Sequence, residues 1–208
     1  MTKRKTAEKI NSEEAAAKAH DEGNQRKKKR FSLKSLSSAL KSWLLLIFIA
    51  IITGYAFVTF LFQTVTVIGP SMMPTLKDNE VVIINKLDYR LHSIERYDVV
   101  AYKKVDSNGY YDIKRVYGLP GETVLIKDGR IYINGEVLED RPVYEAILVT
   151  GIAANETVLG KDEYFVMGDN VNNSEDSRFS NIGNISSTEI KGKVVYVVSP
   201  KGDKRKVR

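Results

Sequence analysis

The stretch WLLLIFIAIITGYAFVTFLF, residues 43–62, contains no charged side chain, and it passes directly into QTVTVI, residues 63–68, which is β-branched and partly alternating. At 1.5 Å per residue, a helix of 20 residues spans about 30 Å, the thickness of the hydrocarbon core of a bilayer. A buried core helix is rarely apolar on every side over this length, and the apolar stretch of a cleavable signal peptide is shorter. We therefore predict one transmembrane helix at residues 43–62, followed by a β-rich domain.

The net charge of +6 is concentrated before the apolar stretch. Residues 1–42 hold 12 lysines and arginines against 5 aspartates and glutamates, whereas residues 43–208 hold 20 against 21. Basic residues favour the cytoplasmic side of a membrane helix, so we expect a single-pass protein of the cell membrane with a cytoplasmic N-terminus and an extracytoplasmic C-terminal domain. We interpret the leader as a disordered topology signal, rather than as a site for nucleic acid or for a specific lipid.

The residue inventory restricts the chemistry of the outer domain. The chain has no cysteine and two histidines, His20 in the polar leader and His92. These counts exclude disulfides, cysteine nucleophiles and thiolate metal sites, and they make a Ser–His triad or a zinc protease site a poor candidate. We expect no metal and no other cofactor.

Short β-branched runs separated by turns recur through the outer domain. They lie at residues 63–68, 80–87, 98–103, 112–116, 123–127, 130–133, 164–167 and 193–198. Asp128-Gly129 and Asn134-Gly135 are two-residue hairpin signals, which predict a three-stranded meander over residues 123–138. The pattern predicts a mostly β fold, an antiparallel β-sandwich or barrel behind one N-terminal transmembrane helix.

The composition divides the chain into four parts. We predict a basic leader at 1–42, the transmembrane helix at 43–62, a β-rich domain at 63–200 and a basic tail at 201–208. The tail has almost no apolar residues, so we expect it to be frayed. Residues 143–161 have a weaker pattern and are predicted to form a hairpin or loop, to which the sequence assigns no role.

A proline-bracketed segment, IGPSMMPT at residues 68–75, follows the first predicted strand. Pro70 and Pro74 fix their own φ angles and restrict the residues that precede them. Ser71 is therefore held in a stiff, non-helical loop. This loop is either a turn that leaves the membrane or a rigid support for a serine nucleophile.

A serine nucleophile needs a base, and with histidine scarce the candidate is a lysine whose pKa is lowered by burial. The segment DIKRVYGLPGE, residues 112–122, contains Lys114 and Arg115. On a strand these two side chains point to opposite faces, so they have different surroundings. Periodicity alone does not separate Lys114 from the other lysines of the outer domain, and an exposed strand lysine is the alternative interpretation.

A third segment, MGDNVNNSEDSR at residues 167–178, is rich in turn residues. Its hydroxyl and carboxylate groups can hydrogen-bond nearby backbone or a neighbouring catalytic group. A calcium loop is the alternative, but the spacing differs from that of an EF-hand and no flanking helices are evident. The segment is therefore interpreted as a supporting loop and not as a metal site.

Together with the apolar stretch, these segments resemble the type I signal peptidases, membrane-bound Ser/Lys proteases that remove signal peptides from exported proteins. The resemblance covers the anchor and, in order, residues 71–75, 97–100, 114–121 and 168–178. It implies exported preproteins as substrates, with small residues such as alanine at the first and third positions before the cut. Gly69 and the short outer domain are similar to those of Gram-positive members.

The resemblance implies roles for individual residues. Ser71 is the implied nucleophile and Lys114 the implied general base. The implied nucleophile loop also includes Gly69, Pro70, Met72 and Pro74. Many relatives have a serine at the position of Gly69, so this chain lacks that side-chain donor to the oxyanion hole and keeps the Ser71 N–H.

The same resemblance assigns five residues to the surroundings of the dyad. Ser174 is expected to orient the lysine. Asp176 and Arg178 are expected to support the site around it, and Asp169 and Arg115 are expected to form an ion pair nearby. The segment departs from the family pattern at Val171-Asn172, where relatives have Arg-Asp, which changes local ion pairing only.

Two other functions fit the sequence. One is a Ser/Lys peptidase dedicated to a single substrate such as a pilus subunit. The other is a non-catalytic, membrane-tethered domain that binds exported chains, and it predicts that Ser71 and Lys114 are dispensable.

Overall fold

The computed structural model describes residues 40–103, 110–140, 142 and 145–207. The chain divides into two compact units, Met1–Phe57 and Val58–Arg208. Most of the predicted leader, residues 1–39, lies outside the described residues, as does Val143 at the start of the weakly patterned segment.

One helix in the described part of the chain, Leu40–Leu61, is long and apolar enough to cross a membrane. It includes the predicted span except Phe62, which begins strand β1 (Phe62–Thr66), and it starts three residues earlier than predicted. Its side chains from Leu40 to Phe60 are exposed. An uncovered helix of this composition is suited to a nonpolar environment in which every backbone group is satisfied within the helix.

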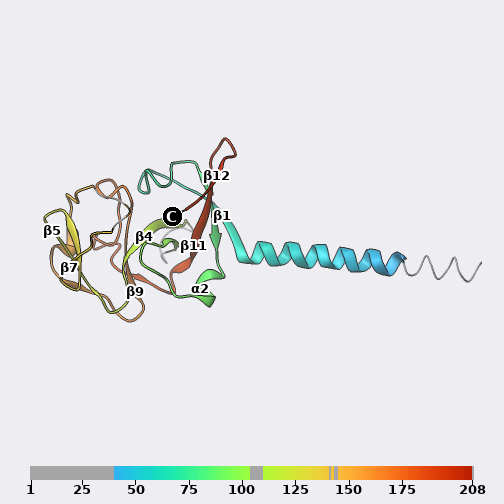
Figure 1. Ribbon diagram of the computed structural model, residues 1–208, viewed down its shortest axis with the longest axis horizontal. Coiled ribbons are helices and arrows are strands. Elements are labelled where there is room, and N and C mark those ends of the chain that lie inside the picture. The colour runs from blue at the N-terminus through green and yellow to red at the C-terminus, as the bar shows by residue number, and fades with distance from the viewer. Residues whose placement is uncertain (1–39, 104–109, 141, 143–144, 208) are drawn as a thin grey trace, which may run out of the picture. The chain divides into compact units, whose positions relative to one another are not determined.

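The unit Val58–Arg208 consists mainly of two sheets, which confirms the mostly β prediction (Figure 1). All pairings between the described strands are antiparallel. The larger sheet has the order β1-β2-β11-β3-β4-β9-β10, with β12 paired to β11. Its further strands are β2 (Val81–Asn85), β3 (Val99–Tyr102), β4 (Asp112–Gly118), β9 (Glu163–Met167), β10 (Ile185–Ser186), β11 (Ile190–Val198) and β12 (Lys204–Lys206).

The smaller sheet has the order β7-β6-β5-β8, with the strands β5 (Thr123–Lys127), β6 (Arg130–Ile133), β7 (Glu136–Val137) and β8 (Thr157–Val158). The predicted meander forms β5, β6 and β7. Asp128, Gly129, Asn134 and Gly135 all have positive φ, as tight hairpin turns require. Of the weakly patterned segment, the described residues 145–161 form a loop with a short 3₁₀ helix, η1 (Gly151–Ala154), and strand β8 completes the smaller sheet.

Strand β3 is buried on both faces and lies at the centre of the larger sheet. Val99 and Ala101 pack into one apolar cluster, and Val100 and Tyr102 pack into another. Lys114 on β4 is the direct partner of Val100. Because opposite residues in an antiparallel pair share a face, Lys114 lies on an apolar face of the sheet.

A short helix, α2 (Asp88–Leu91), follows β2. Within the domain, Figure 1 shows α2 and β1 at one end and the smaller-sheet strands β5 and β7 at the other. The larger sheet carries Lys114 on β4, and Ser71 lies on the loop between β1 and β2.

The prediction of a frayed C-terminal tail is wrong for Lys204–Lys206, which form β12 against β11. The Arg205 guanidinium donates to both carboxylate oxygens of buried Glu80 at 2.8 Å and to the Thr75 carbonyl at 2.7 Å. The hydrogen bond from Arg205 lowers the pKa of Glu80. Composition does not predict this strand, because it is stabilised by a carboxylate distant in sequence and by Val207, which packs against an apolar cluster of the domain.

Candidate active site

The loop that carries Ser71 is a compact turn. The Gly69 N–H donates to the Asp78 carboxylate at 2.8 Å, and Gly69 has a φ of +85°, which glycine adopts without strain. Met72 and Leu76 are buried and anchor the loop in one apolar cluster. The Met73–Pro74 peptide bond is cis. The loop is thus both a turn after the first strand and a rigid mount for Ser71.

The Lys114 Nζ lies 2.9 Å from the Ser71 Oγ and donates a hydrogen bond to it. Lys114 is only 5% exposed, so the interpretation as an exposed strand lysine is wrong. Burial in this apolar site lowers the pKa of Lys114, and the nearby carboxylates of Asp112, Asp176 and Glu175 oppose the shift without cancelling it. A neutral amine at this separation can instead accept the hydroxyl proton.

Asn170 holds the serine loop from the side of the third segment. Its N–H donates to the Ser71 carbonyl at 3.0 Å, and its side-chain amide donates to the Pro70 carbonyl at 3.2 Å. Gly168 lies in the third segment where it approaches the serine loop, and a Cβ added there would lie 2.7 Å from the Cβ of Ser174 and closer still to the Ser71 carbonyl oxygen. This close approach explains why the position is glycine.

Arg115 points to the opposite face of β4 and forms the predicted pair with Asp169. The two side chains are almost fully buried and joined by two hydrogen bonds, Nε to Oδ1 at 2.8 Å and Nη2 to Oδ2 at 2.7 Å. Arg115 also donates to the Tyr97 carbonyl at 2.8 Å, and the Thr75 hydroxyl donates to Asp169. The pair therefore connects β4, the third segment and the end of the serine loop.

Asp176 and Arg178 form a second buried ion pair. The guanidinium donates to the carboxylate through Nε at 2.7 Å and Nη2 at 2.9 Å. Asp176 also accepts the Gly168 N–H at 3.0 Å, and Arg178 donates to the Val149 carbonyl at 3.0 Å. These bonds shape the third segment where it passes the serine loop.

Ser174 belongs to the same segment, but its hydroxyl forms no hydrogen bond with Lys114. Its hydroxyl oxygen is buried and has no hydrogen-bond partner within residues 40–103, 110–140, 142 and 145–207. The role of Ser174 in orienting Lys114 stays a prediction.

One backbone donor is available beside the Ser71 hydroxyl. The Ser71 N–H has no acceptor among the residues that the structure describes, whereas the Gly69 N–H is bonded to Asp78. An N–H beside the nucleophile is where an oxyanion would accept a hydrogen bond. The predicted oxyanion donor is therefore free to act.

Sequence reasoning gave no role to Thr75, Asn170 or Arg205. Thr75 and Asn170 lie within the segments that carry the resemblance, so their positions could have identified them as site residues. Arg205 lies outside every motif, and only the pairing of β12 with β11 brings it to the loop.

We predict that Asp169→Asn and Arg115→Met each lower the free energy of unfolding by about 3–5 kcal/mol, because each leaves a buried charge without its partner. The double variant should cost less than the sum of the two, by about 1 kcal/mol or more. Denaturant unfolding of the three variants measures this coupling. Strictly additive costs would show that the pair is not coupled. Charge reversal is a weaker test, because the Tyr97 carbonyl and the Thr75 hydroxyl would then face the wrong charge.

The chain is similar to known proteins over most of its length. The model of the family described as signal peptidase, peptidase S26, matches residues 40–199. A signal peptidase I P of Bacillus subtilis subsp. natto is 34% identical over 189 residues, which cover 88% of this chain and 99% of the relative. Signal peptidase I of Bacillus caldolyticus is 35% identical over 160 residues, which cover 72% of this chain and 86% of the relative.

Among solved structures, the crystal structure of a signal peptidase I from Enterococcus faecalis V583 is 34% identical to this chain, with a TM-score of 0.40. The match covers 50% of this chain and 97% of that one. The family match extends from the apolar helix through every segment that meets at Ser71 and Lys114. This chain therefore belongs to the signal peptidase family, peptidase S26.

Proposed function

We propose that this protein is a membrane-bound serine endopeptidase that cleaves signal peptides from exported preproteins, with Ser71 as nucleophile and Lys114 as general base. The observation that carries the proposal is the 2.9 Å contact between the Ser71 Oγ and the buried Lys114 Nζ. Family membership supports the same chemistry. The non-catalytic alternative gives no reason for a lysine to be buried against a serine hydroxyl.

The proposed reaction proceeds through an acyl-enzyme. Neutral Lys114 takes the proton of the Ser71 hydroxyl as the Oγ attacks the scissile carbonyl carbon, and the oxyanion accepts the Ser71 N–H. The Lys114 ammonium then gives its proton to the leaving amine as the C–N bond breaks. Lys114 next takes a proton from water, the resulting hydroxide attacks the ester, and the returning proton restores the serine hydroxyl.

We propose that the apolar helix spans the bilayer, that the basic leader is cytoplasmic, and that β1 to β12 form the extracytoplasmic peptidase domain. Ser71 follows the helix end at Leu61 by ten residues, which keeps the nucleophile near the membrane surface. The apolar part of a signal peptide would deliver its cleavage site there. An extended substrate with alanine at the first and third positions before the cut fits this arrangement.

Removing either member of the dyad should abolish processing of a preprotein with an Ala-x-Ala site. We expect Ser71→Ala and Lys114→Met to lower the cleavage rate by about 10²–10⁴-fold, and Lys114→Arg to fail equally because a guanidinium stays protonated. Lys127→Met, an exposed lysine on β5, is the matched control and should keep the wild-type rate. Cleavage by folded Ser71→Ala at the wild-type rate would refute the mechanism. Processing of one preprotein out of several would point to the dedicated peptidase.

The pH dependence should report the lowered pKa of Lys114. Below this pKa the amine is protonated and cannot accept the serine proton, so kcat/KM should fall about tenfold per pH unit there, at a lower pH than an ordinary lysine would give. Asp112→Asn removes a carboxylate that raises the pKa of Lys114, so the acidic limb should move to lower pH. Rate profiles from pH 5 to 10 measure both effects. A limb that moves to higher pH in Asp112→Asn would contradict the assignment.

The orientation can be tested with single cysteines, because the chain has none of its own. We expect a membrane-impermeant maleimide to label Ser180→Cys, an exposed position of the β domain, in intact cells. Ser12→Cys in the leader should be labelled only after lysis. The reverse pattern would overturn the proposed orientation.

A further inference from the structure

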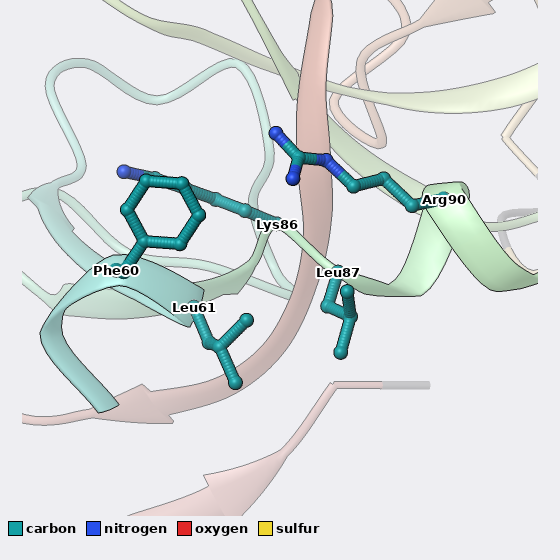
Figure 2. A pocket seen from close by; sticks show the side chains of 5 residues that line it. All are labelled: Phe60, Leu61, Lys86, Leu87 and Arg90. Atoms are coloured by element: carbon teal, nitrogen blue, oxygen red, sulfur yellow. The ribbon is translucent and has the colours of Figure 1, made fainter. Parts of the chain in front are cut away.

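A hollow of about 210 Å³ lies where the apolar helix ends and the β domain begins (Figure 2). Its walls are formed by Phe60, Leu61, Lys86, Leu87 and Arg90. The Lys86 N–H donates to the Leu61 carbonyl at 2.9 Å, and Phe62 pairs with Asn85 in the β1–β2 ladder. The chain on both sides of the hollow is thus tied together by backbone hydrogen bonds.

One side of the hollow is charged and the other side is apolar. Figure 2 shows the charged ends of Lys86 and Arg90 on one side and the side chains of Leu61 and Leu87 on the other. Phe60 is 67% exposed, and the Arg90 guanidinium lies 5.8 Å from the centre of its ring. A ligand that fits this hollow has an anionic group next to an apolar chain.

The two cations have no protein counter-ion within the described ranges. Neither Lys86 nor Arg90 forms a salt bridge there, and no carboxylate lines the hollow. The acidic residue of α2, Asp88, faces Lys193 at 3.9 Å and His92 at 3.8 Å instead. The positive charge of the hollow is therefore available to an external anion.

A second hollow of about 350 Å³ adjoins the first and shares Lys86 and Arg90 with it. Lys191 adds a third cation, and Tyr111 and Ser187 add hydroxyl groups. No carboxylate lines this hollow either, among the residues that the structure describes. The pair of hollows thus offers an apolar wall, a cationic centre and a polar extension, in that order.

We propose that this site binds an anionic phospholipid of the leaflet at which the helix ends. Lys86 and Arg90 contact the lipid phosphate, an acyl chain lies along Leu61 and Phe60, and the polar headgroup extends toward Lys191. The proposal rests on the proposed insertion of the helix. Residues at the end of a span of this length lie at the depth of lipid headgroups, where aromatic and basic side chains are favoured. A soluble phosphate would make no use of the apolar wall.

The test uses the full-length protein in detergent micelles that contain either phosphatidylglycerol or phosphatidylcholine at equal mole fraction. Native mass spectrometry measures the lipid retained by the protein. Repeating the measurement while each lipid is titrated gives the preference for phosphatidylglycerol over phosphatidylcholine. The double variant Lys86→Gln/Arg90→Gln removes the proposed contacts. The matched control Lys127→Gln/Arg130→Gln removes two exposed cations from the β5–β6 hairpin of the smaller sheet, with the same change in net charge. Thermal unfolding in phosphatidylcholine micelles checks that both variants are folded.

We expect the wild type and the control to prefer phosphatidylglycerol, and Lys86→Gln/Arg90→Gln to lose about thirtyfold in that preference. This thirtyfold loss corresponds to a factor of about five in affinity for each basic residue near an anionic membrane surface. An equal preference in the two variants, or none in the wild type, would overturn the proposal. Displacement of the lipid by millimolar inorganic phosphate would also overturn it, because the site would then be a simple phosphate site.

The failure of this proposal can be separated from a failure of the proposed function. Cleavage of an Ala-x-Ala preprotein by the wild type in phosphatidylcholine micelles reports the peptidase without the anionic lipid. Resistance of the wild type in membranes to alkaline extraction reports insertion of the helix. An active, inserted enzyme without a lipid preference would remove only the lipid site.

Discussion

The burial of Lys114 against Ser71 is the constraint on which the rest of the site depends. A lysine can serve as a base only when its amine is neutral, and the apolar face of β4 lowers its pKa in the required direction. The serine is 43 positions away in sequence and lies on a loop, so that loop must be held within hydrogen-bond distance of the strand. Most of the polar interactions around the site serve this requirement.

Side chains of the third segment, of β4 and of β12 hold the serine loop. Asn170 donates to the carbonyls of Pro70 and Ser71, and the buried pair of Arg115 and Asp169 reaches Thr75 through its hydroxyl. Arg205 on β12 donates to the Thr75 carbonyl. Burying a charged side chain is costly unless it is paired. The charged side chains in these contacts can lie beside an apolar core because each guanidinium is paired with a carboxylate.

The fold was largely readable from local patterns. β5 and β6 have the bounds that alternation predicts, and their hairpin turns follow from the Asp-Gly and Asn-Gly pairs. The β12 strand was missed because its basic residues carry no apolar pattern and its partner Glu80 is 125 positions away. Of the candidate site, the opposite directions of Lys114 and Arg115 followed from strand geometry alone, whereas their roles came from resemblance.

The sequence by itself determined the apolar helix, the β class of the domain, the meander and the stiffness of the loop around Ser71, because each depends on residues close together in the chain. Only the tertiary structure decided that Lys114 is buried, that its Nζ meets the Ser71 Oγ, and that Lys86 and Arg90 face a common hollow. The physical reason is that desolvation and charge pairing depend on which distant strands pack together. A local pattern does not contain that information.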